Sequence, residues 1–256
     1  MTTSAAVIIP ARWASSRFPG KPLAPLAGHP VIRHVYAAAT AACPDALICV
    51  ATDDPRIYDA VHAFGGRAVL TRPDHPSGSD RILEALDLLD PHHTISFIVN
   101  LQGDEPLLPP PYLRKALAAL QQHPHAHWAT LVYPISSPDS IRNPNVVKVV
   151  MANDGSALYF SRAPIPFDRD ATGAAQYFAH IGLYVYRAPT LRQFVSWPQG
   201  RLERSEKLEQ LRALEHGLKI LCVPVDHPTV GIDTPEDLHT AEALLRANPR
   251  LSALST

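Results

Sequence analysis

The stretch "AAVIIPARWASSRFPGKPL", residues 5–23, contains a strand and then a basic loop. The apolar run at residues 5–10 is typical of a strand buried on both faces. The next residues include Arg12, Arg17 and Lys21, although a connection between a strand and a helix needs only turn residues. In an open parallel sheet, ligands bind beyond the carboxyl ends of the strands, and arginine and lysine there suit phosphate. The alternative is a solvated basic loop.

The loop does not match the common nucleotide motifs. A P-loop would have glycine in place of Ser15 and serine or threonine in place of Pro22. The chain also contains no Gly-x-Gly-x-x-Gly. The pair Pro19-Gly20 predicts a tight turn, since proline sets one torsion and glycine allows a positive one.

Strand and helix patterns alternate through the first half of the chain, which predicts a mostly parallel sheet covered by helices on both faces. The pattern changes after Asn143, where two segments predict antiparallel strands with a turn at residues 153–155. We therefore expect one domain over residues 1–256, with an inserted antiparallel lobe at about 144–200. The predicted strands are residues 5–10, 46–52, 67–72, 96–106 ending in a polar loop, 127–135, 145–167 interrupted by the turn at 153–155, 177–187 and 219–225. The predicted helices are residues 30–43, 54–66, 77–90, 110–122, 204–217 and 234–247.

Composition excludes several classes of protein. The chain has 256 residues, with 23 Lys and Arg against 24 Asp and Glu, so its net charge of −1 gives no general attraction to nucleic acid or to an anionic membrane. Three cysteines form no disulfide framework or metal-like cluster. No apolar stretch has the length of a membrane span, and no signal pattern begins the chain. These features predict a soluble protein of a reducing cytoplasm.

Eight segments stand out along the chain, in order and almost end to end. They are "IIPARWASSRFPGKPL" from Ile8, "DHPSGSDRI" from Asp74, "VNLQGDEP" from Val99, "NPNVVKVV" from Asn143, "ALYFSRAPIPFDRD" from Ala157, "HIGLYVYR" from His180, "LEQLRALEHG" from Leu208 and "VGIDTPEDL" from Val230. These segments resemble the sugar-activating cytidylyltransferases, and in particular the branch that activates 3-deoxy-manno-octulosonate (Kdo). The first loop has the Arg-x-x-x-Ser-x-Arg-x-Pro-Gly-Lys form of that branch, whereas relatives that act on sialic acid usually have a Gly-rich version.

The resemblance implies a Rossmann-like nucleotidyltransferase sheet and a nucleotide site for CTP. In-line attack on the α-phosphorus needs charge neutralisation and positioning, which suits the cations of the first loop. Ser77 and Gly78 would lie against the cytosine, although "SGSD" also fits a plain helix N-terminus. The implied nucleotide-binding residues are Ala11, Arg12, Ser15, Arg17, Lys21, Arg72, Ser77, Gly78 and Asp104, and the implied catalytic residues are Arg12, Arg17, Lys21, Asp104 and Asp233.

The resemblance also implies a magnesium ion held by Asp104 and Asp233. Both residues follow predicted strands, and two carboxylates with phosphates and waters make a typical Mg²⁺ site. The alternative for Asp233 is a helix-capping acid, and Asp226 is a weaker rival for the metal. Bound metal would draw charge from the α-phosphate and lower the pKa of the attacking hydroxyl.

The second substrate implied by the resemblance is Kdo, a sugar acid whose pocket needs a cation and several hydrogen-bonding groups. Solvent exposure is the alternative for Glu209 and Gln210, and a satisfied core histidine is the alternative for His180. The implied sugar-binding residues are Arg81, Gln102, Arg162, His180, Tyr184, Glu209 and Gln210.

Taken together, the resemblance implies transfer of CMP from CTP to the anomeric hydroxyl of Kdo, for lipopolysaccharide biosynthesis in a Gram-negative cytoplasm. The antiparallel lobe would build a homodimer. The alternatives are activation of another ulosonic acid, such as 8-amino-Kdo or sialic acid, and a non-catalytic nucleotide-sugar-binding protein. Loss of Lys21, Asp104 or Asp233 would favour the second alternative, and all three residues are present. A glycosyltransferase would more naturally show Asp-x-Asp, where this chain has "GDEP".

Overall fold

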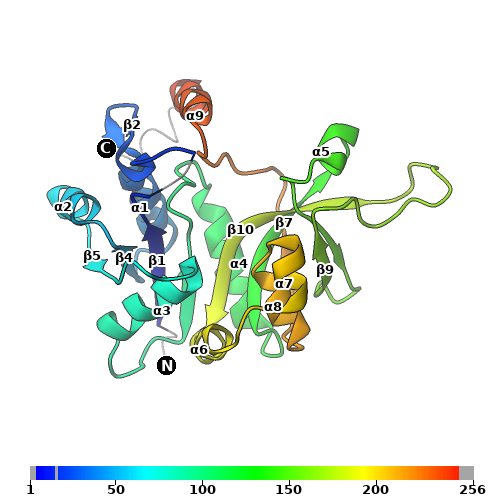
Figure 1. Ribbon diagram of the computed structural model, residues 1–256, viewed down its shortest axis with the longest axis horizontal. Helices are drawn as coiled ribbons and strands as arrows, with labels where there is room; N and C mark the ends of the chain where they lie inside the picture. The colour runs from blue at the N-terminus through cyan, green and yellow to red at the C-terminus, as the bar shows by residue number, and fades with distance from the viewer. Residues whose placement is uncertain (1–3, 15–16, 248–256) are drawn as a thin grey trace. The chain divides into compact units, whose positions relative to one another are not determined.

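The computed structural model of the protein describes residues 4–14 and 17–247. The chain divides into two compact units, the first formed by residues 1–114 with 229–256 and the second by residues 115–228. Figure 1 labels their helices and strands.

The first unit contains a parallel sheet of four strands in the order β6-β1-β4-β5. In the central strand, Ile8 is in register with Cys49 on one side and with Asn100 on the other. Because the strands are parallel, their carboxyl ends lie at one edge of the sheet. The strands are β1 (Ala5–Ala11), β4 (Leu47–Thr52), β5 (Ala68–Leu70) and β6 (Phe97–Asn100).

Continuous burial shows that both faces of this sheet are covered. Residues 6–9 of β1 and all four residues of β6 are buried. Successive side chains of a strand point to opposite faces, so a run of buried residues requires cover on both sides. The apolar run at residues 5–10 predicted this arrangement, and the structure confirms it.

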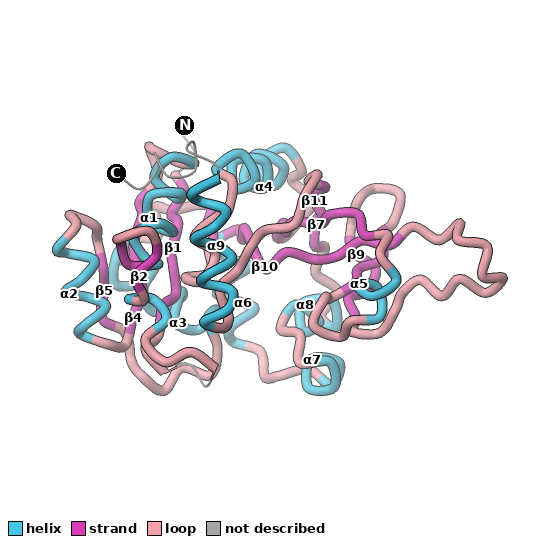
Figure 2. The backbone as a smooth tube through the Cα atoms, turned by 90° about the horizontal axis from the view of Figure 1, so that it is seen from above, coloured by secondary structure: helices cyan, strands magenta, loops and turns pink. Residues whose placement is uncertain are grey.

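Helices connect the strands of the first unit, and capping residues fix where three of them begin. Asp54 accepts a hydrogen bond from the backbone N–H of Arg56, and Ser77 and Thr234 cap their helices in the same way. Figure 2 shows these helices around the strands from above. The helices are α1 (Val31–Ala42), α2 (Pro55–Ala63), α3 (Gly78–Leu89) and α9 (Pro235–Ala247), with the short η1 (Lys21–Leu23) and the two-residue strands β2 (Pro25–Leu26) and β3 (His29–Pro30) after the first loop. The helix α4 (Pro110–Gln122) contains the boundary between the units.

The second unit is built mainly on antiparallel pairs. β10 pairs antiparallel with β7 and with β8, and β8 pairs antiparallel with β9, whereas β11 is parallel to β7. The predicted turn at residues 153–155 is confirmed, since the N–H of Gly155 donates to the carbonyl of Ala152. The strands are β7 (Trp128–Ile135), β8 (Lys148–Met151), β9 (Ala157–Ser161), β10 (Tyr177–Arg187) and β11 (Ile220–Pro224).

One predicted helix of the second unit is wrong in its extent. The pattern predicts a single helix over residues 204–217, but the structure contains two short ones, α7 (Arg201–Glu206) and α8 (Gln210–Glu215). Lys207 separates them with a φ of 54°, a left-handed conformation that ends a right-handed helix. The other helices are α5 (Pro138–Arg142) and α6 (Ala188–Ser196).

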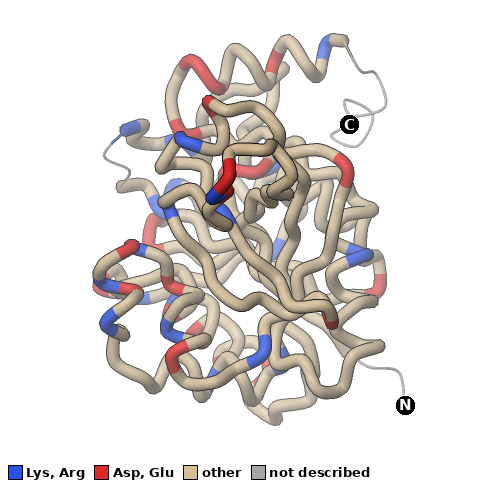
Figure 3. The backbone as a smooth tube through the Cα atoms, turned by 90° about the vertical axis from the view of Figure 1, so that its right-hand side faces the viewer, with Lys and Arg blue, Asp and Glu red and all other residues tan. Residues whose placement is uncertain are grey.

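The predicted fold class is confirmed, since a mostly parallel sheet with helices is combined with antiparallel strands. The assignment of residues 144–200 to a dimerisation and sugar-binding lobe stays a prediction. Figure 3 shows basic and acidic residues interspersed along the backbone, in keeping with the net charge of −1. Within the described residues, no helix has the length and apolar character needed to cross a membrane.

Candidate active site

A cavity of about 350 Å³ lies in the first unit, at the carboxyl ends of β1 and β6. Open parallel sheets bind ligands at this edge. The cavity brings together residues from four separate parts of the sequence. The residues expected from the sequence that line it are Ala11, Arg12, Arg17, Lys21, Ser77, Gly78, Arg81, Gln102, Asp104 and Asp233.

The basic loop after β1 folds back on itself around Trp13. The N–H of Gly20 donates to the carbonyl of Trp13 over 3.0 Å, and Gly20 has a φ of 73°. A Cβ atom at Gly20 would lie 3.0 Å from the indole ring, so both the positive φ and the close approach favour glycine here. The tight turn predicted at Pro19-Gly20 is therefore confirmed, and it directs Lys21 into the cavity. Ser15, which the resemblance placed at the phosphates, lies outside the described residues.

Lys21 joins two carboxylates that are far apart in the sequence. Its Nζ lies 2.8 Å from Oδ2 of Asp104 and 3.3 Å from Oδ1 of Asp233. The other oxygen of Asp233 lies 3.1 Å from Nη2 of Arg17. The Lys21 side chain is only 11% exposed, whereas those of Asp233 and Arg17 are 50% and 65% exposed. The ammonium is thus the more deeply placed of the two cations.

Close backbone contacts fix the position of the two carboxylates. Gly103 passes so near the end of β1 that a Cβ atom there would lie 2.8 Å from the carbonyl oxygen of Pro10. The N–H of Ile232 donates to the carbonyl of Asp104 over 2.8 Å, which joins the loop before α9 to the loop after β6. Asp237 accepts the N–H of Asp233 over 2.9 Å. Asp237, rather than Asp233, is the acid that stabilises the first turn of α9.

Glu105 is a buried carboxyl group that the sequence did not single out. Burial raises its pKa to about 7, and the negative charges of Asp104 and Asp233 act in the same direction. Its Oε2 has no hydrogen-bond partner among the described residues. Thr229 opposes the shift by hydrogen bonding to the carboxyl group. The position after Asp104 in "GDEP" was the available signal, but acidic residues are usually exposed.

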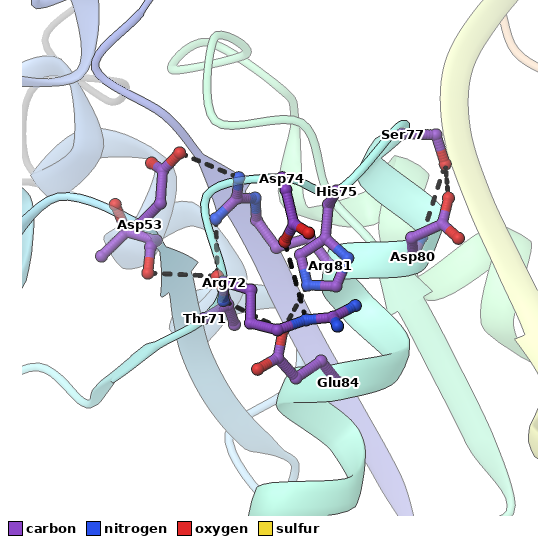
Figure 4. A network of polar contacts seen from close by, with 10 residues as sticks. Asp53, Thr71, Arg72, Asp74, His75, Ser77, Asp80, Arg81 and Glu84 are labelled. Carbon is purple, nitrogen blue, oxygen red and sulfur yellow. Dashed lines mark hydrogen bonds and ion pairs between the residues drawn. The ribbon is translucent and has the colours of Figure 1, made fainter.

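A network of polar contacts supports one wall of the cavity, and Figure 4 shows its residues. Arg81, on α3, is buried, and its guanidinium donates to Oγ1 of Thr71 over 2.5 Å and to Oδ2 of Asp53 over 3.1 Å. The ring of His75 contacts the carboxylate of Glu84. His75 lines the cavity and was not expected from the sequence. Both contacts fix side chains of the segment that carries Ser77 and Gly78.

Ser77 has the helix-capping role that was the alternative for "SGSD". Its Oγ accepts the N–H of Asp80 over 3.4 Å and donates to the Asp80 carboxylate over 2.6 Å. Ser77 and Gly78 also line the cavity, so the capping role and the place in the pocket occur together. Arg72 differs, since it is absent from the lining and its 68% exposed side chain lies 3.7 Å from Asp74 and 3.9 Å from Glu84.

The residues implied for the sugar are divided between the units. Arg81 and Gln102 belong to the first unit, where Gln102 donates to the side chain of Asn100 over 3.0 Å. The other five belong to the second unit, where one follows β9, two lie in β10 and two lie at the start of α8. They are Arg162, His180, Tyr184, Glu209 and Gln210.

Aromatic and amide groups of this set lie together in the second unit. The rings of His180 and Tyr184 are 5.4 Å apart, and the Tyr184 hydroxyl donates to Gln210 over 3.2 Å. Gln210 is 3% exposed, so its alternative interpretation as a surface residue is wrong. His180 contacts Oγ1 of Thr130 at 2.9 Å, and burial lowers its pKa to about 3. The imidazole is therefore neutral at physiological pH.

Arg162 is held by backbone carbonyl groups. Its guanidinium donates to the carbonyls of Glu206, Pro144 and Lys207 over 2.7, 2.8 and 3.4 Å. The carboxylate of Glu206 accepts the backbone N–H of Arg162 over 2.9 Å. These contacts join the end of β9 to the segment after α7. Three of the five guanidinium donors are used in this way.

Comparisons with known proteins agree with this geometry. A family model described as Cytidylyltransferase matches residues 6–220. A 3-deoxy-manno-octulosonate cytidylyltransferase of Syntrophobacter fumaroxidans is 53% identical over 242 residues, covering 93% of this chain and 95% of the relative.

The chain belongs to the cytidylyltransferase family. Another 3-deoxy-manno-octulosonate cytidylyltransferase, from Paramagnetospirillum magneticum, is 49% identical over 246 residues and covers 94% of this chain and 97% of its own. A solved structure of CMP:2-keto-3-deoxy-manno-octonic acid synthetase complexed with CTP has a TM-score of 0.90 and 42% identity, covering 95% of this chain and 99% of that one. A 4-diphosphocytidyl-2C-methyl-D-erythritol synthase from Anaerococcus prevotii, at 16% identity and a TM-score of 0.60, shares the fold alone.

The carboxylates of this cytidylyltransferase fit a divalent cation. An oxygen of Asp104 and one of Asp233 already converge on a single positive centre, the Nζ of Lys21. Hard cations such as Mg²⁺ prefer carboxylate oxygens and usually keep waters and substrate phosphates as the remaining ligands. Among residues 4–14 and 17–247, no group of three or more His, Cys, Asp or Glu side chains forms a metal site.

Proposed function

We propose that the protein transfers CMP from CTP to the anomeric hydroxyl of Kdo, forming CMP-Kdo and pyrophosphate. The observation that carries this proposal is the meeting of Lys21, Asp104 and Asp233 in one cavity, in a chain 53% identical to a 3-deoxy-manno-octulosonate cytidylyltransferase. These three residues come from three separate parts of the sequence, and phosphoryl-group chemistry needs both cations and metal-binding carboxylates.

The basic loop would bind the triphosphate. Arg12 and Arg17 each offer a planar fork of N–H donors that matches phosphate oxygens, and Lys21 offers a compact positive charge. All three line the cavity. Charge on the leaving pyrophosphate grows as the bond to the α-phosphorus breaks, so cations fixed beside it stabilise the transition state more than the ground state.

Asp104 and Asp233 would hold Mg²⁺, as their convergence on Lys21 Nζ supports. When bound, the ion draws charge from the α-phosphate and lowers the pKa of the attacking hydroxyl. The cytosine would lie against Ser77 and Gly78, where the small side chains of the α3 N-terminus line the cavity. Ala11 lines the same cavity at the end of β1.

Residues of the second unit would bind the sugar acid. His180, Tyr184 and Gln210 form one group of polar side chains, with Glu209 next to Gln210. Arg162 would supply a positive charge for the sugar carboxylate. It would do so through the guanidinium N–H donors that are not bonded to backbone carbonyls. Gln102 lines the cavity of the first unit, and its assignment to the sugar stays a prediction. For Arg81 the contacts with Thr71 and Asp53 favour a supporting role in the nucleotide wall.

We also propose a cytoplasmic homodimer that uses the antiparallel strands of the second unit. The three cysteines are free and buried, which suits a reducing compartment.

Pyrophosphate release with CTP and a panel of ulosonic acids tests the function. We expect release with Kdo and a divalent ion, and loss of activity with excess chelator. A preference for 8-amino-Kdo or sialic acid would replace the proposed sugar, and no turnover with any of them would contradict the proposed reaction.

A further inference from the structure

We propose that Lys21 is an exchangeable counter-ion of the Asp104–Asp233 pair. Its ammonium group lies between the two carboxylates, and it leaves that position for the triphosphate when a divalent cation binds there. This inference rests on the proposed function, because it assumes that the two carboxylates hold the metal.

The geometry shows one cation shared by two anions. Nζ of Lys21 lies 2.8 Å from one oxygen of Asp104 and 3.3 Å from one oxygen of Asp233. An ammonium group has three N–H donors, so the two carboxylates use most of its capacity. A divalent cation bound to the same two oxygens would need the same space. Lys21 and the metal therefore compete for one position.

Burial makes the exchange obligatory rather than optional. The Lys21 side chain is 11% exposed, and a desolvated charge is costly unless it is paired. The ammonium can leave the carboxylates only for another anion. The phosphates of CTP are such an anion, and the cavity that Lys21 lines has room for them at about 350 Å³. Arg17 does not replace it, since its contact with Asp233 is exposed to solvent and worth little.

The backbone around Lys21 is fixed, but its side chain is long. Gly20 and the ring of Trp13 pack against each other immediately before it, and the N–H of Lys21 donates to the carbonyl of Phe18. The four-carbon stem of lysine allows its ammonium to change partners without movement of this turn. The short side chains of Asp104 and Asp233 have no comparable freedom.

Charge balance predicts that metal and nucleotide favour each other's binding. If Lys21 moved to the triphosphate without a metal, Asp104 would face the phosphates unpaired and Asp233 would keep only its solvent-exposed contact with Arg17, and like charges repel. If a metal bound without nucleotide, the ammonium would lose both partners. Metal binding therefore lowers the free-energy cost of unpaired charge that nucleotide binding would have alone, and nucleotide binding does the same for the metal. Such coupling is reciprocal. A fixed structural ion pair, with Lys21 bound to the carboxylates throughout, would give no such coupling.

Binding of Mn²⁺ to the nucleotide-free protein tests the exchange without measuring activity. We expect Lys21→Met to raise the Mn²⁺ affinity by about tenfold, or about 1.4 kcal/mol, as measured by electron paramagnetic resonance of the free ion. Lys219→Met is the matched control, since it removes a lysine that lies 3.6 Å from Asp154 in the second unit and is 56% exposed. This control should leave the affinity unchanged.

A double variant identifies the site of the gain. Adding Asp104→Asn to Lys21→Met should abolish the tighter binding, because it removes one carboxylate. Lys21→Gln, which keeps the polar stem and removes the charge, should give the same gain and replaces Lys21→Met if that variant does not fold. Unchanged or weaker Mn²⁺ binding in a folded Lys21→Met or Lys21→Gln protein would overturn the counter-ion role. Pyrophosphate release by the wild-type protein tests the proposed function separately.

Discussion

Replacement of Lys148 by methionine should destabilise the second unit. Lys148 is fully buried in β8, and its Nζ donates to the backbone carbonyls of Asn143, Val146 and Arg162 over 2.8, 2.6 and 2.6 Å. It therefore joins the segment before β8 to the end of β9. Methionine fills a similar volume but has no donor, so the three carbonyls lose their partner.

The magnitude follows from those three acceptors. An orphaned acceptor costs about 1–3 kcal/mol when it is fully buried, so the gross loss for these three partly buried carbonyls stays below about 9 kcal/mol. Part of this is recovered, because burial lowers the pKa of Lys148 and so shows that its charged form is itself unfavourable inside the protein. We expect the free energy of unfolding to fall by about 3 kcal/mol, close to the cost of breaking other buried charged networks.

Urea unfolding followed by tryptophan fluorescence measures the change. Trp128 is 1% exposed in β7 and packs against Tyr186 and Phe194, so its emission reports on the second unit. The exposed control Lys219→Met should change the unfolding free energy by less than about 0.5 kcal/mol. A loss below about 1 kcal/mol for Lys148→Met, with an unchanged denaturant slope, would refute the reasoning from its three carbonyl contacts.

Four further outcomes are expected. Arg17→Ala should lower turnover by about 100-fold or more in a folded protein, as loss of a preorganised transition-state contact does, and near-normal turnover would make the loop a solvated connector. Asp104→Asn or Asp233→Asn should raise the metal concentration needed for half-maximal activity, and full activity in excess chelator would remove the metal from the mechanism. Arg162→Ala should lower the melting temperature through its carbonyl contacts and also raise the KM for Kdo, whereas a melting change with both substrate constants unaltered would leave only the structural role. Burial lowers the pKa of His180 from the ordinary 6.5 to about 3, so its contribution to the free energy of unfolding is full above pH 6.5 and is lost as the pH falls toward 3. The wild-type protein should therefore lose up to about 2 kcal/mol of unfolding free energy through this group between pH 7 and pH 5, and His180→Gln should not show that part of the loss.

The sequence predicted the first unit well because its signals are local. Continuous apolar strands and Pro-Gly at residues 19–20 each act within a few positions, and the structure confirms them. The rule that ligands bind at the carboxyl ends of parallel strands then brought the residues after β1 and β6 to one place. Ten residues expected from the sequence line the resulting cavity.

Features that depend on residues far apart in the sequence were harder to predict. Helical periodicity continues through residues 204–217, yet Lys207 ends α7 with a positive φ, and no local signal such as glycine marks that break. Gln210 has the polarity of a surface residue but is buried beside Tyr184. The raised pKa of Glu105 depends on burial and on the charges of Asp104 and Asp233, and the last of these is far away in the sequence.

The two kinds of charge in the cavity are on side chains of different length, and this difference bears on the proposed mechanism. The carboxylates of Asp104 and Asp233 are on short side chains whose backbones are fixed by the Ile232–Asp104 hydrogen bond and by the close approach of Gly103 to Pro10. Lys21 has its charge at the end of a long stem. The substrate begins with about four negative charges, and pyrophosphate then leaves as a separate anion. The positive charge therefore needs to follow the phosphates while the metal ligands stay in place. Fixed acids and a mobile ammonium meet that need without movement of the backbone.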